Sequence, residues 1–240
     1  MRNKRKLIII STAGIIAALG GGILFLLIPG QPAPVRIMPL GNSITQGDVE
    51  FGSYRRPLWH MLNKLGYNVD FVGSTRLHYP RHEPLIPDYD MDHEGHRGWR
   101  VEHILARIEG EAELEVPDIV LIHLGTNDIF HHQENPGTVE ELRRIILRLR
   151  ELNPQIRILL AQIIPIDDKI LFGEVEKLNA LLPALAADLS TPLSPVILVD
   201  QFTGFDPGED TYDGVHPNKK GNIKMAERWH AGLISFLDNQ

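Results

Sequence analysis

The sequence contains no cysteine, which excludes disulfide bonds, thiolate metal sites and a lipid-modified N-terminal cysteine. The sequence also lacks an excess of positive charge, because 24 Lys and Arg stand against 31 Asp and Glu, which gives a formal net charge of -7 and a pI of about 5.9. No cluster of Lys or Arg is apparent beyond the first six residues. Proteins that bind the phosphate backbone of nucleic acids rely on such clusters. The composition therefore argues against a nucleic-acid partner, and the absence of thiols leaves the redox compartment open.

Long hydrophobic runs are absent except for the uncharged segment Leu7–Ile28, which follows the basic residues Arg2, Lys4, Arg5 and Lys6. A helix of this length can cross the ~30 Å hydrocarbon core of a bilayer. The positive-inside rule keeps the basic residues in the cytoplasm. We therefore expect residues 1–28 to be a cytoplasmic stub and a single transmembrane anchor, with the remainder of the chain outside the cytoplasm.

A cleaved signal peptide is the alternative for this segment, and it would give a secreted protein. Ala18–Gly20 loosely fits a small-residue cleavage site, but cleavage there would leave the apolar stretch Gly21–Ile28 exposed on the mature chain. Residues 29–34 are rich in proline and indicate a short, stiff linker. Residues 35–240 are long enough to form one domain with a single core.

Residues 35–240 alternate short apolar runs with longer amphipathic ones, a pattern typical of βα units and of a parallel sheet covered on both faces. The segment Thr75–Asp92 has three prolines and no periodicity, so we expect a long loop there. The pattern indicates an open, doubly wound α/β sheet, whose ligands bind beyond the carboxyl ends of the strands. The predicted strands are Val35–Leu40, Val69–Val72, Ile119–Leu124, Ile156–Ile163 and Val196–Asp200, and the predicted helices are Tyr54–Leu65, Val101–Ile108, Val139–Leu152, Val175–Leu189 and Lys219–Leu237.

Four short strings contain the residue types that acyl transfer needs, and they are Gly41–Thr45, His93–Trp99, Gly125–Asp128 and Asp213–Pro217. In the first string, Ser43 follows a strand at a sharp turn, where its hydroxyl can be exposed as a nucleophile. The alternative is a serine that caps a helix. The G-x-S-x-G nucleophile elbow is absent, because a threonine occupies the position of its last glycine.

His216 has an aspartate three residues before it, in a loop that leads into the last predicted helix. Asp213 can hold the imidazole in the tautomer that accepts a proton from Ser43. The alternative is an Asp-Gly turn followed by a His-Pro pair at a helix start, which on its own is the more common arrangement. The partnership with Ser43 favours a catalytic role for both residues.

The oxyanion of acyl transfer needs hydrogen-bond donors that are already in place. The backbone amides of Ser43 and Gly98 and the side-chain amide of Asn127 can supply them, with Gly95 as the alternative to Gly98. The strings that contain these residues also fit ordinary polar turns. We expect Asp128, next to Asn127, to be structural rather than catalytic.

In this order, Ser43, Gly98, Asn127 and His216 resemble the SGNH, or GDSL-type, serine hydrolase family, which is named after those residue types. The strings Gly52–Arg55, Gly66–Gly73 and Asp92–His96 are similar to the branch that contains the family 3 carbohydrate esterases, which act as acetylxylan esterases. The resemblance covers residues 35–240, which it identifies as an SGNH hydrolase domain. It implies a three-layer α/β/α sandwich with a flavodoxin-like, five-stranded parallel sheet.

Two residues depart from the pattern of that family. Asn42 replaces the aspartate of the GDSL string, which removes one negative charge but keeps a short side chain that can bond the local backbone. Arg97 precedes the expected oxyanion glycine. Its charge either favours an acidic or phosphate-bearing substrate or points to solvent, and we expect the second.

Eleven histidines suggest a metal site, but their spacing does not support one. The string His93–His96 is one residue short of H-E-x-x-H. Asp88–Asp92 begins like a calcium loop, but His93 stands at the position of its turn glycine. We expect no metal and no cofactor. Instead, His93 and Glu94 should pack beside the rim of the site, and His123 should be a core histidine.

The sequence therefore predicts a membrane-anchored, extracytoplasmic esterase that uses a Ser43–His216–Asp213 triad and an acyl-enzyme. Its expected substrates are small-molecule or polysaccharide esters, in particular acetyl esters of carbohydrate. A lipid hydrolase of the lysophospholipase or thioesterase type is the alternative within the same family. A carbohydrate-binding protein without turnover is the alternative from another class. No protein partner can be inferred.

Overall fold

Five parallel strands form the centre of the structure, a computed structural model that describes residues 17–19, 22–24, 32–110 and 115–238. The sheet order is β4-β3-β6-β7-β8, and every pairing among these strands is parallel. In order of appearance along the chain this is the 2-1-3-4-5 order of flavodoxin-like sheets. The predicted fold class is confirmed. The strands are β3 (Val35–Gly41), β4 (Val69–Phe71), β6 (Ile119–His123), β7 (Arg157–Gln162) and β8 (Val196–Asp200).

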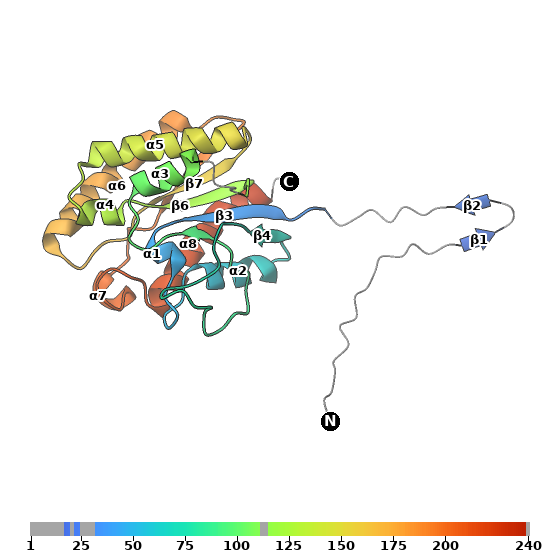
Figure 1. The fold of residues 1–240 in the computed structure, drawn as a ribbon, viewed down its shortest axis with the longest axis horizontal. Helices are drawn as coiled ribbons and strands as arrows, with labels where there is room; N and C mark the ends of the chain where they lie inside the picture. Colours follow the sequence, from blue (N-terminus) through green and yellow to red (C-terminus); the bar gives the residue numbers. More distant parts are fainter. Residues whose placement is uncertain (1–16, 20–21, 25–31, 111–114, 239–240) are drawn as a thin grey trace, which may run out of the picture. The chain divides into compact units, whose positions relative to one another are not determined.

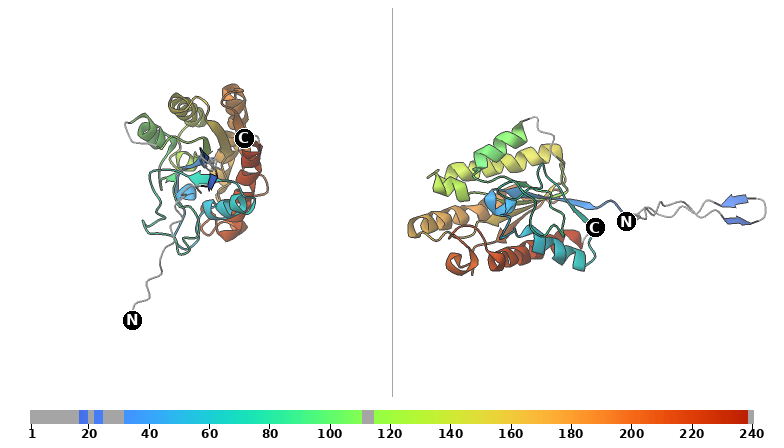
Figure 2. Two further views of the ribbon diagram at one scale, coloured as in Figure 1. Left: turned by 90° about the vertical axis from the view of Figure 1, so that its right-hand side faces the viewer. Right: turned by 60° about the horizontal axis from the view of Figure 1, so that its bottom comes forward.

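Helices cover both faces of this sheet, which gives three layers (Figure 1, Figure 2). One face carries α3 (Val101–Glu109), α5 (Asn135–Leu152) and α6 (Lys169–Leu189). The other face carries α2 (Arg55–Lys64) and α8 (Lys219–Leu237). The short helices α1 (Ser43–Gln46), α4 (Thr126–Phe130) and α7 (Pro207–Asp210) lie at the end of the sheet where β3 and β6 finish.

The central strands are buried on both sides, because successive side chains of a strand point to opposite faces of the sheet. In β6, Val120 and Ile122 pack in the core with α3, α5 and α6, whereas Ile119 and Leu121 pack in the core with α2 and α8. All four side chains are 0% exposed. Burial on both faces explains why these strands are continuous apolar runs in the sequence.

The predicted elements agree with the structure except near some ends. Helices α5 and α6 begin earlier than predicted, and α6 does so because Asp168 caps it by accepting hydrogen bonds from the amides of Ile170 and Leu171. The segment 75–92 contains only isolated bridges and no helix, as expected for a loop. Helices α1, α4 and α7 and the two-residue strand β5 (Glu94–Gly95) were not predicted, because elements this short have no periodicity.

The expected transmembrane helix is not supported. Within 1–28 the structure describes only β1 (Ala17–Leu19) and β2 (Gly22–Leu24), which pair as antiparallel strands. Glycines at positions 20–22 interrupt the apolar run, and consecutive glycines weaken a helix interior. No helix among the described residues is long and apolar enough to cross a membrane. The rest of the expected anchor, and residues 29–31 of the expected linker, lie outside the described residues.

Candidate active site

Ser43 is the first residue of α1, and one residue, Asn42, separates it from the end of β3. The cap of this helix is Asn42, whose Oδ1 accepts a 3.0 Å hydrogen bond from the amide of Ile44. Gly41 permits the close turn, since a Cβ there would lie 2.2 Å from Oγ1 of Thr45. The capping role that the sequence left open for Ser43 therefore belongs to Asn42, and the Ser43 hydroxyl is free for another partner.

A hydrogen-bonded chain joins Ser43, His216 and Asp213. Oγ of Ser43 lies 2.9 Å from Nε2 of His216, and Nδ1 of His216 lies 2.7 Å from Oδ2 of Asp213. Partial burial raises the pKa of Asp213, but hydrogen bonds from the amide and ring of His216 outweigh it and hold the pKa below its usual range. An ionised Asp213 favours a proton on Nδ1, which leaves Nε2 able to accept the proton of the Ser43 hydroxyl.

Besides the amide of Ser43, the expected oxyanion donors lie on α4 and on the turn 96–99. Hydrogen bonds connect the turn to α1 and α4 to the turn. The amide of Arg97, which precedes Gly98, donates to Oε1 of Gln46 at 2.9 Å, and Gln46 is the last residue of α1. Nδ2 of Asn127 donates to the carbonyl of Trp99 at 2.7 Å. The second Nδ2 hydrogen of Asn127 and the amide of Gly98 have no acceptor in the described part of the chain. Both are available to an oxygen of a ligand.

The structure distinguishes between Gly95 and Gly98 as candidate oxyanion donors. The amide of Gly95 donates to Nδ1 of His93 at 2.9 Å, so it is already used. A Cβ on Gly95 would lie 2.6 Å from the amide nitrogen of Gln46. This explains why β5 has a glycine where it packs against α1. Gly98 has a φ of 77° and open space at the Cβ position. Of the two, only Gly98 has a free amide at an exposed turn.

The buried carboxylate of Glu94, on β5, stabilises the turn 96–99. Glu94 is 0% exposed and accepts hydrogen bonds from Nε2 of His96 at 2.6 Å, from the amide of Ser74 at 2.8 Å and from Nε of Arg107. Burial raises the pKa of Glu94, but these partners outweigh it and lower the pKa to about 2. His96 also stacks on Trp99, with ring centroids 4.1 Å apart. Glu94 thus lies beside the rim in the role expected for it.

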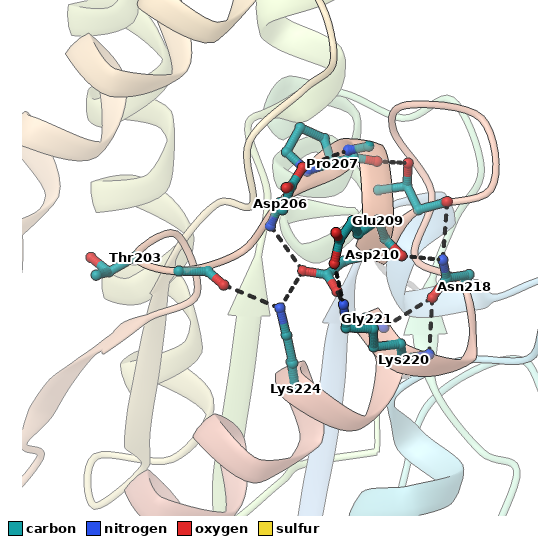
Figure 3. Close-up of polar contacts among 12 residues, drawn as sticks. Thr203, Asp206, Pro207, Glu209, Asp210, Asn218, Lys220, Gly221 and Lys224 are labelled. Carbon is teal, nitrogen blue, oxygen red and sulfur yellow. Dashed lines mark hydrogen bonds and ion pairs between the residues drawn. The ribbon is translucent and has the colours of Figure 1, made fainter.

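The His216 loop, residues 211–217, is closed at its base by a second buried carboxylate (Figure 3). Asp210 is 0% exposed, lies 2.5 Å from Nζ of Lys224 and accepts a 2.8 Å hydrogen bond from the amide of Asp206. Its backbone carbonyl accepts the amide of Asn218 at 2.9 Å, and the Asn218 side chain caps α8. Both ends of the loop are therefore fastened to each other and to α8.

Arg55 is a supporting residue that sequence reasoning missed. Its side chain is 0% exposed and donates hydrogen bonds to the carbonyls of Thr45 (2.9 Å), Gln46 (2.9 Å) and Met91 (2.6 Å). Burial lowers the pKa of Arg55. Two of these carbonyls end α1, so Arg55 fixes the far end of the helix that begins with Ser43. No local pattern separates this arginine from a surface arginine in the first turn of a helix.

Two other buried polar residues near the site have structural roles. Asp128 accepts the amide of Val101 at 3.1 Å and so caps α3, and burial raises its pKa to about 6. His123 is 0% exposed, Nε2 accepts the amide of Ile164 at 3.3 Å, and burial lowers its pKa to about 4. Nδ1 of His123 has no hydrogen-bond partner within residues 32–110 and 115–238. Among the residues that the structure describes, no group of three or more His, Cys, Asp or Glu is arranged to hold a metal ion.

Two cavities of very different size border the site. A cavity of about 10 Å³ is lined by both Ser43 and His216. A groove of about 590 Å³ shares Gly52 and Asn222 with that cavity, so the two are neighbours. Apolar side chains dominate the groove, among them Val49, Phe51, Met61, Leu85, Ile86 and Ile223.

Arg97 is exposed, as expected, but its side chain does not only point to solvent. The guanidinium carbon lies 4.0 Å from the centre of the Tyr79 ring. Arg97 also lines the small cavity together with Ser43 and His216. The side chain is thus exposed to solvent, as expected, and it also borders the small cavity beside Ser43.

Residues 40–222 match the GDSL-like lipase/acylhydrolase family. The chain is 31% identical over 227 residues to a multidomain esterase of Ruminococcus flavefaciens, a match that covers 85% of this chain and 29% of that protein. The chain thus spans less than a third of the length of this curated relative.

Solved structures are similar over a larger share of their own length. An acetyl esterase mutant with a bound acetate ion matches with a TM-score of 0.75 and 31% identity, over 85% of this chain and 99% of the other. A carbohydrate esterase family 3 protein from Talaromyces cellulolyticus matches with a TM-score of 0.75 and 31% identity, over 86% and 99% of the two chains. The likeness therefore extends over nearly all of both solved chains.

Proposed function

The chain belongs to the GDSL-like lipase/acylhydrolase family, and from that premise we propose that it is a serine esterase that removes acetyl groups from carbohydrate. The family assignment made from Ser43, Gly98, Asn127 and His216, including the similarity to family 3 carbohydrate esterases, is confirmed. The names of the relatives support a carboxylic ester hydrolase and, more narrowly, an acetyl esterase.

In the proposed mechanism, His216 takes the proton of Ser43 while Oγ attacks the carbonyl carbon of the ester. The amides of Ser43 and Gly98 and Nδ2 of Asn127 donate to the resulting oxyanion. The tetrahedral intermediate collapses, His216 gives the proton to the departing alcohol oxygen, and the acyl group remains on Ser43. His216 then activates a water that releases the acid and restores the serine, while Asp213 stays ionised and orients the imidazole throughout.

The observation that carries the proposal is the hydrogen-bonded chain from Ser43 through His216 to Asp213, beside a cavity of about 10 Å³. A cavity of this size has room for a group about as large as one water molecule. That supports an acetyl group rather than a longer acyl chain next to the nucleophile.

The test is hydrolysis of p-nitrophenyl acetate, butyrate and octanoate by the full chain and by its Ser43→Ala variant, followed by acetate release from acetylated xylan. We expect the highest kcat/KM for acetate and no turnover by the variant. An absence of Ser43-dependent turnover on every substrate would contradict the proposal and favour a carbohydrate-binding protein.

A lipid hydrolase is the second candidate, and the groove of about 590 Å³ next to the small cavity favours it. Ligand pockets of several hundred Å³ with apolar walls bind extended apolar groups. Preference for octanoate in the same series, with loss in Ser43→Ala, would move the assignment to this candidate.

We also propose that the domain acts outside the cytoplasm, on the support of the basic cluster and the uncharged run that follows it. Alkaline phosphatase fused after Gln240 should be active in bacterial cells if this is correct. Deletion of residues 1–34 from the fusion should abolish that activity, and an active deleted fusion would contradict the proposal.

A further inference from the structure

Arg97 lines the small cavity beside Ser43 and His216, and no carboxylate within residues 32–110 and 115–238 forms an ion pair with it. Exposed arginines usually gain little from a partner, so its lack of one would mean little on a plain surface. At the mouth of a catalytic pocket, an unpaired guanidinium is a ready donor for an anionic ligand.

The main chain around this guanidinium is fixed relative to the nucleophile. The amide of Arg97 donates to Oε1 of Gln46 at 2.9 Å, and Gln46 ends the helix that Ser43 begins. The amide of Tyr79 donates to the carbonyl of Gly47 at 3.0 Å, and Gly47 is the C-cap of the same helix. The backbones of Arg97 and Tyr79 are therefore both hydrogen-bonded to α1 or its C-cap.

Contact with the ring of Tyr79 orients the guanidinium without using its hydrogen-bond donors. The attraction between a cation and a ring face is electrostatic and needs no N–H group. The N–H donors of an arginine lie in one plane as a rigid fork that matches the oxygens of a carboxylate. Arg97, 4.0 Å from the centre of the Tyr79 ring, therefore keeps donors for a ligand beyond the one that reaches Tyr212.

Tyr212 connects Arg97 to the catalytic histidine. Its ring stacks on the imidazole of His216, with centroids 5.7 Å apart and an interplanar angle of 16°. Burial and the carboxylates of Asp213 and Asp48 raise the pKa of Tyr212 to about 12, and the charge of Arg97 and a side-chain hydrogen bond from it oppose that rise. The positive charge of Arg97 therefore acts within the ring cluster that surrounds the imidazole.

Asp48 is the acidic residue that lines the same cavity, and its contacts are local. Its Oδ1 accepts the amide of Glu50 at 2.8 Å and that of Phe51 at 3.4 Å, which stabilises its own turn. Within the described residues 32–110, Asp48 forms no ion pair with Arg97. A ligand anion could thus reach the guanidinium without displacing a carboxylate of the protein.

We propose that Arg97 binds the carboxylate of a uronic acid residue, so that the substrate is an acetylated acidic polysaccharide. The inference rests on the proposed esterase function and names its substrate class. A phosphate on the sugar offers the same oxyanion chemistry, and the test includes it. A charge-assisted pair at a partly desolvated site typically changes affinity by about 10- to 100-fold.

The test compares three acetylated methyl glycosides of matched structure: a galactoside, a galacturonate and a galactoside 6-phosphate. Acetate release by the full chain should have the highest kcat/KM for the galacturonate. Arg97→Met should lower the ratio of kcat/KM for galacturonate over galactoside by about 10- to 100-fold, and Arg97→Lys should lower it less. Lys177→Met removes an equal charge from an exposed pair with Glu174 and should leave the ratio unchanged.

Binding provides a readout that does not require turnover. In the Ser43→Ala protein, titration calorimetry should detect tighter binding of methyl galacturonate than of methyl galactoside, and Arg97→Met should abolish the difference. Equal binding of both sugars, or a difference that survives Arg97→Met, would overturn the inference. Ser43-dependent hydrolysis with no preference for the uronate would overturn it while leaving the esterase proposal intact. Preference for the phosphate would overturn the choice of a carboxylate.

Discussion

The two sides of the site are held in place by different kinds of structure. Ser43 follows a central strand, and β5 pairs with the end of that strand through the register Gly41 to Gly95. Arg55 and Glu94 are buried around this side and each makes several hydrogen bonds. His216, by contrast, lies on a loop outside the sheet.

The loop side is held by contacts outside the sheet. A single bridge joins Thr211 to Pro217, and the buried pair of Asp210 and Lys224 fastens the base of the loop to α8. Segments outside the core with few long-range contacts are the first to open locally. We therefore expect the His216 side of the site to be the more sensitive one to the loss of a single supporting side chain.

The largest effect should come from breaking the link between the two sides. Ser43→Ala and His216→Ala should each lower kcat on p-nitrophenyl acetate by roughly 10⁴- to 10⁶-fold, because the two residues act as a unit. The double variant should be no slower than either single variant. Losses that multiply in the double variant would mean that the two sides contribute independently.

A smaller loss is expected from the donor on the sheet side. Asn127→Ala should lower kcat by ~10²- to 10³-fold with little change in KM, because it removes one oxyanion donor. Asn153, whose side chain donates to the carbonyl of Pro117 at 2.9 Å, offers a matched control that should leave kcat unchanged. An Asn127→Ala variant with normal kcat would exclude this residue from the oxyanion site.

Glu94, which supports the sheet side, should make the free energy of unfolding depend on pH. The pKa of Glu94 is lowered from 4.5 to about 2, so its stabilisation is complete above pH 4.5 and disappears as the pH falls towards 2. The shift corresponds to about 3 kcal/mol. Urea unfolding of Glu94→Gln should lack that pH dependence, whereas the exposed Glu151→Gln control should keep it. Parallel curves for wild type and Glu94→Gln would contradict the assignment.

Loss of the Lys224–Asp210 ion pair, which supports the loop side, should have the smallest effect on stability, but it should also lower catalysis. Lys224→Met removes the nearer of the two lysines that pair with the buried Asp210, and we expect a loss of about 2 kcal/mol because Lys224 is itself 29% exposed. The kcat should fall several-fold and the downfield proton signal of His216 Nδ1 should broaden. Lys177→Met is the control, since Lys177 pairs with the exposed Glu174, away from the loop.

The kcat values of Lys224→Met and Glu94→Gln test the contrast between the two sides of the site. We expect Lys224→Met to lower kcat more than Glu94→Gln does, although Glu94→Gln costs more stability. If Glu94→Gln has the larger effect on kcat, the sheet side is the sensitive one and the contrast between the two sides is wrong.

The strand positions and the site strings could be predicted because each has a local cause. Burial on both faces makes a strand such as Ile119–His123 a continuous apolar run, and a turn that carries chemistry needs particular residues in sequence, as at Asp213 and His216. The starts of α5 and α6 were missed, because their first turns lie outside the periodic apolar pattern.

By itself, the sequence determined the α/β class, the family and the residues that carry the proposed chemistry. Only the tertiary structure decided that Asn42 caps α1, that Gly98 rather than Gly95 has a free amide, and that Arg97 lines the small cavity. It also revealed Arg55 and Asp210 as buried supports, with Asp210 held by Lys224 from another element. The physical reason is that the burial of a charge and the identity of its partner depend on contacts between distant segments, which leave no local pattern.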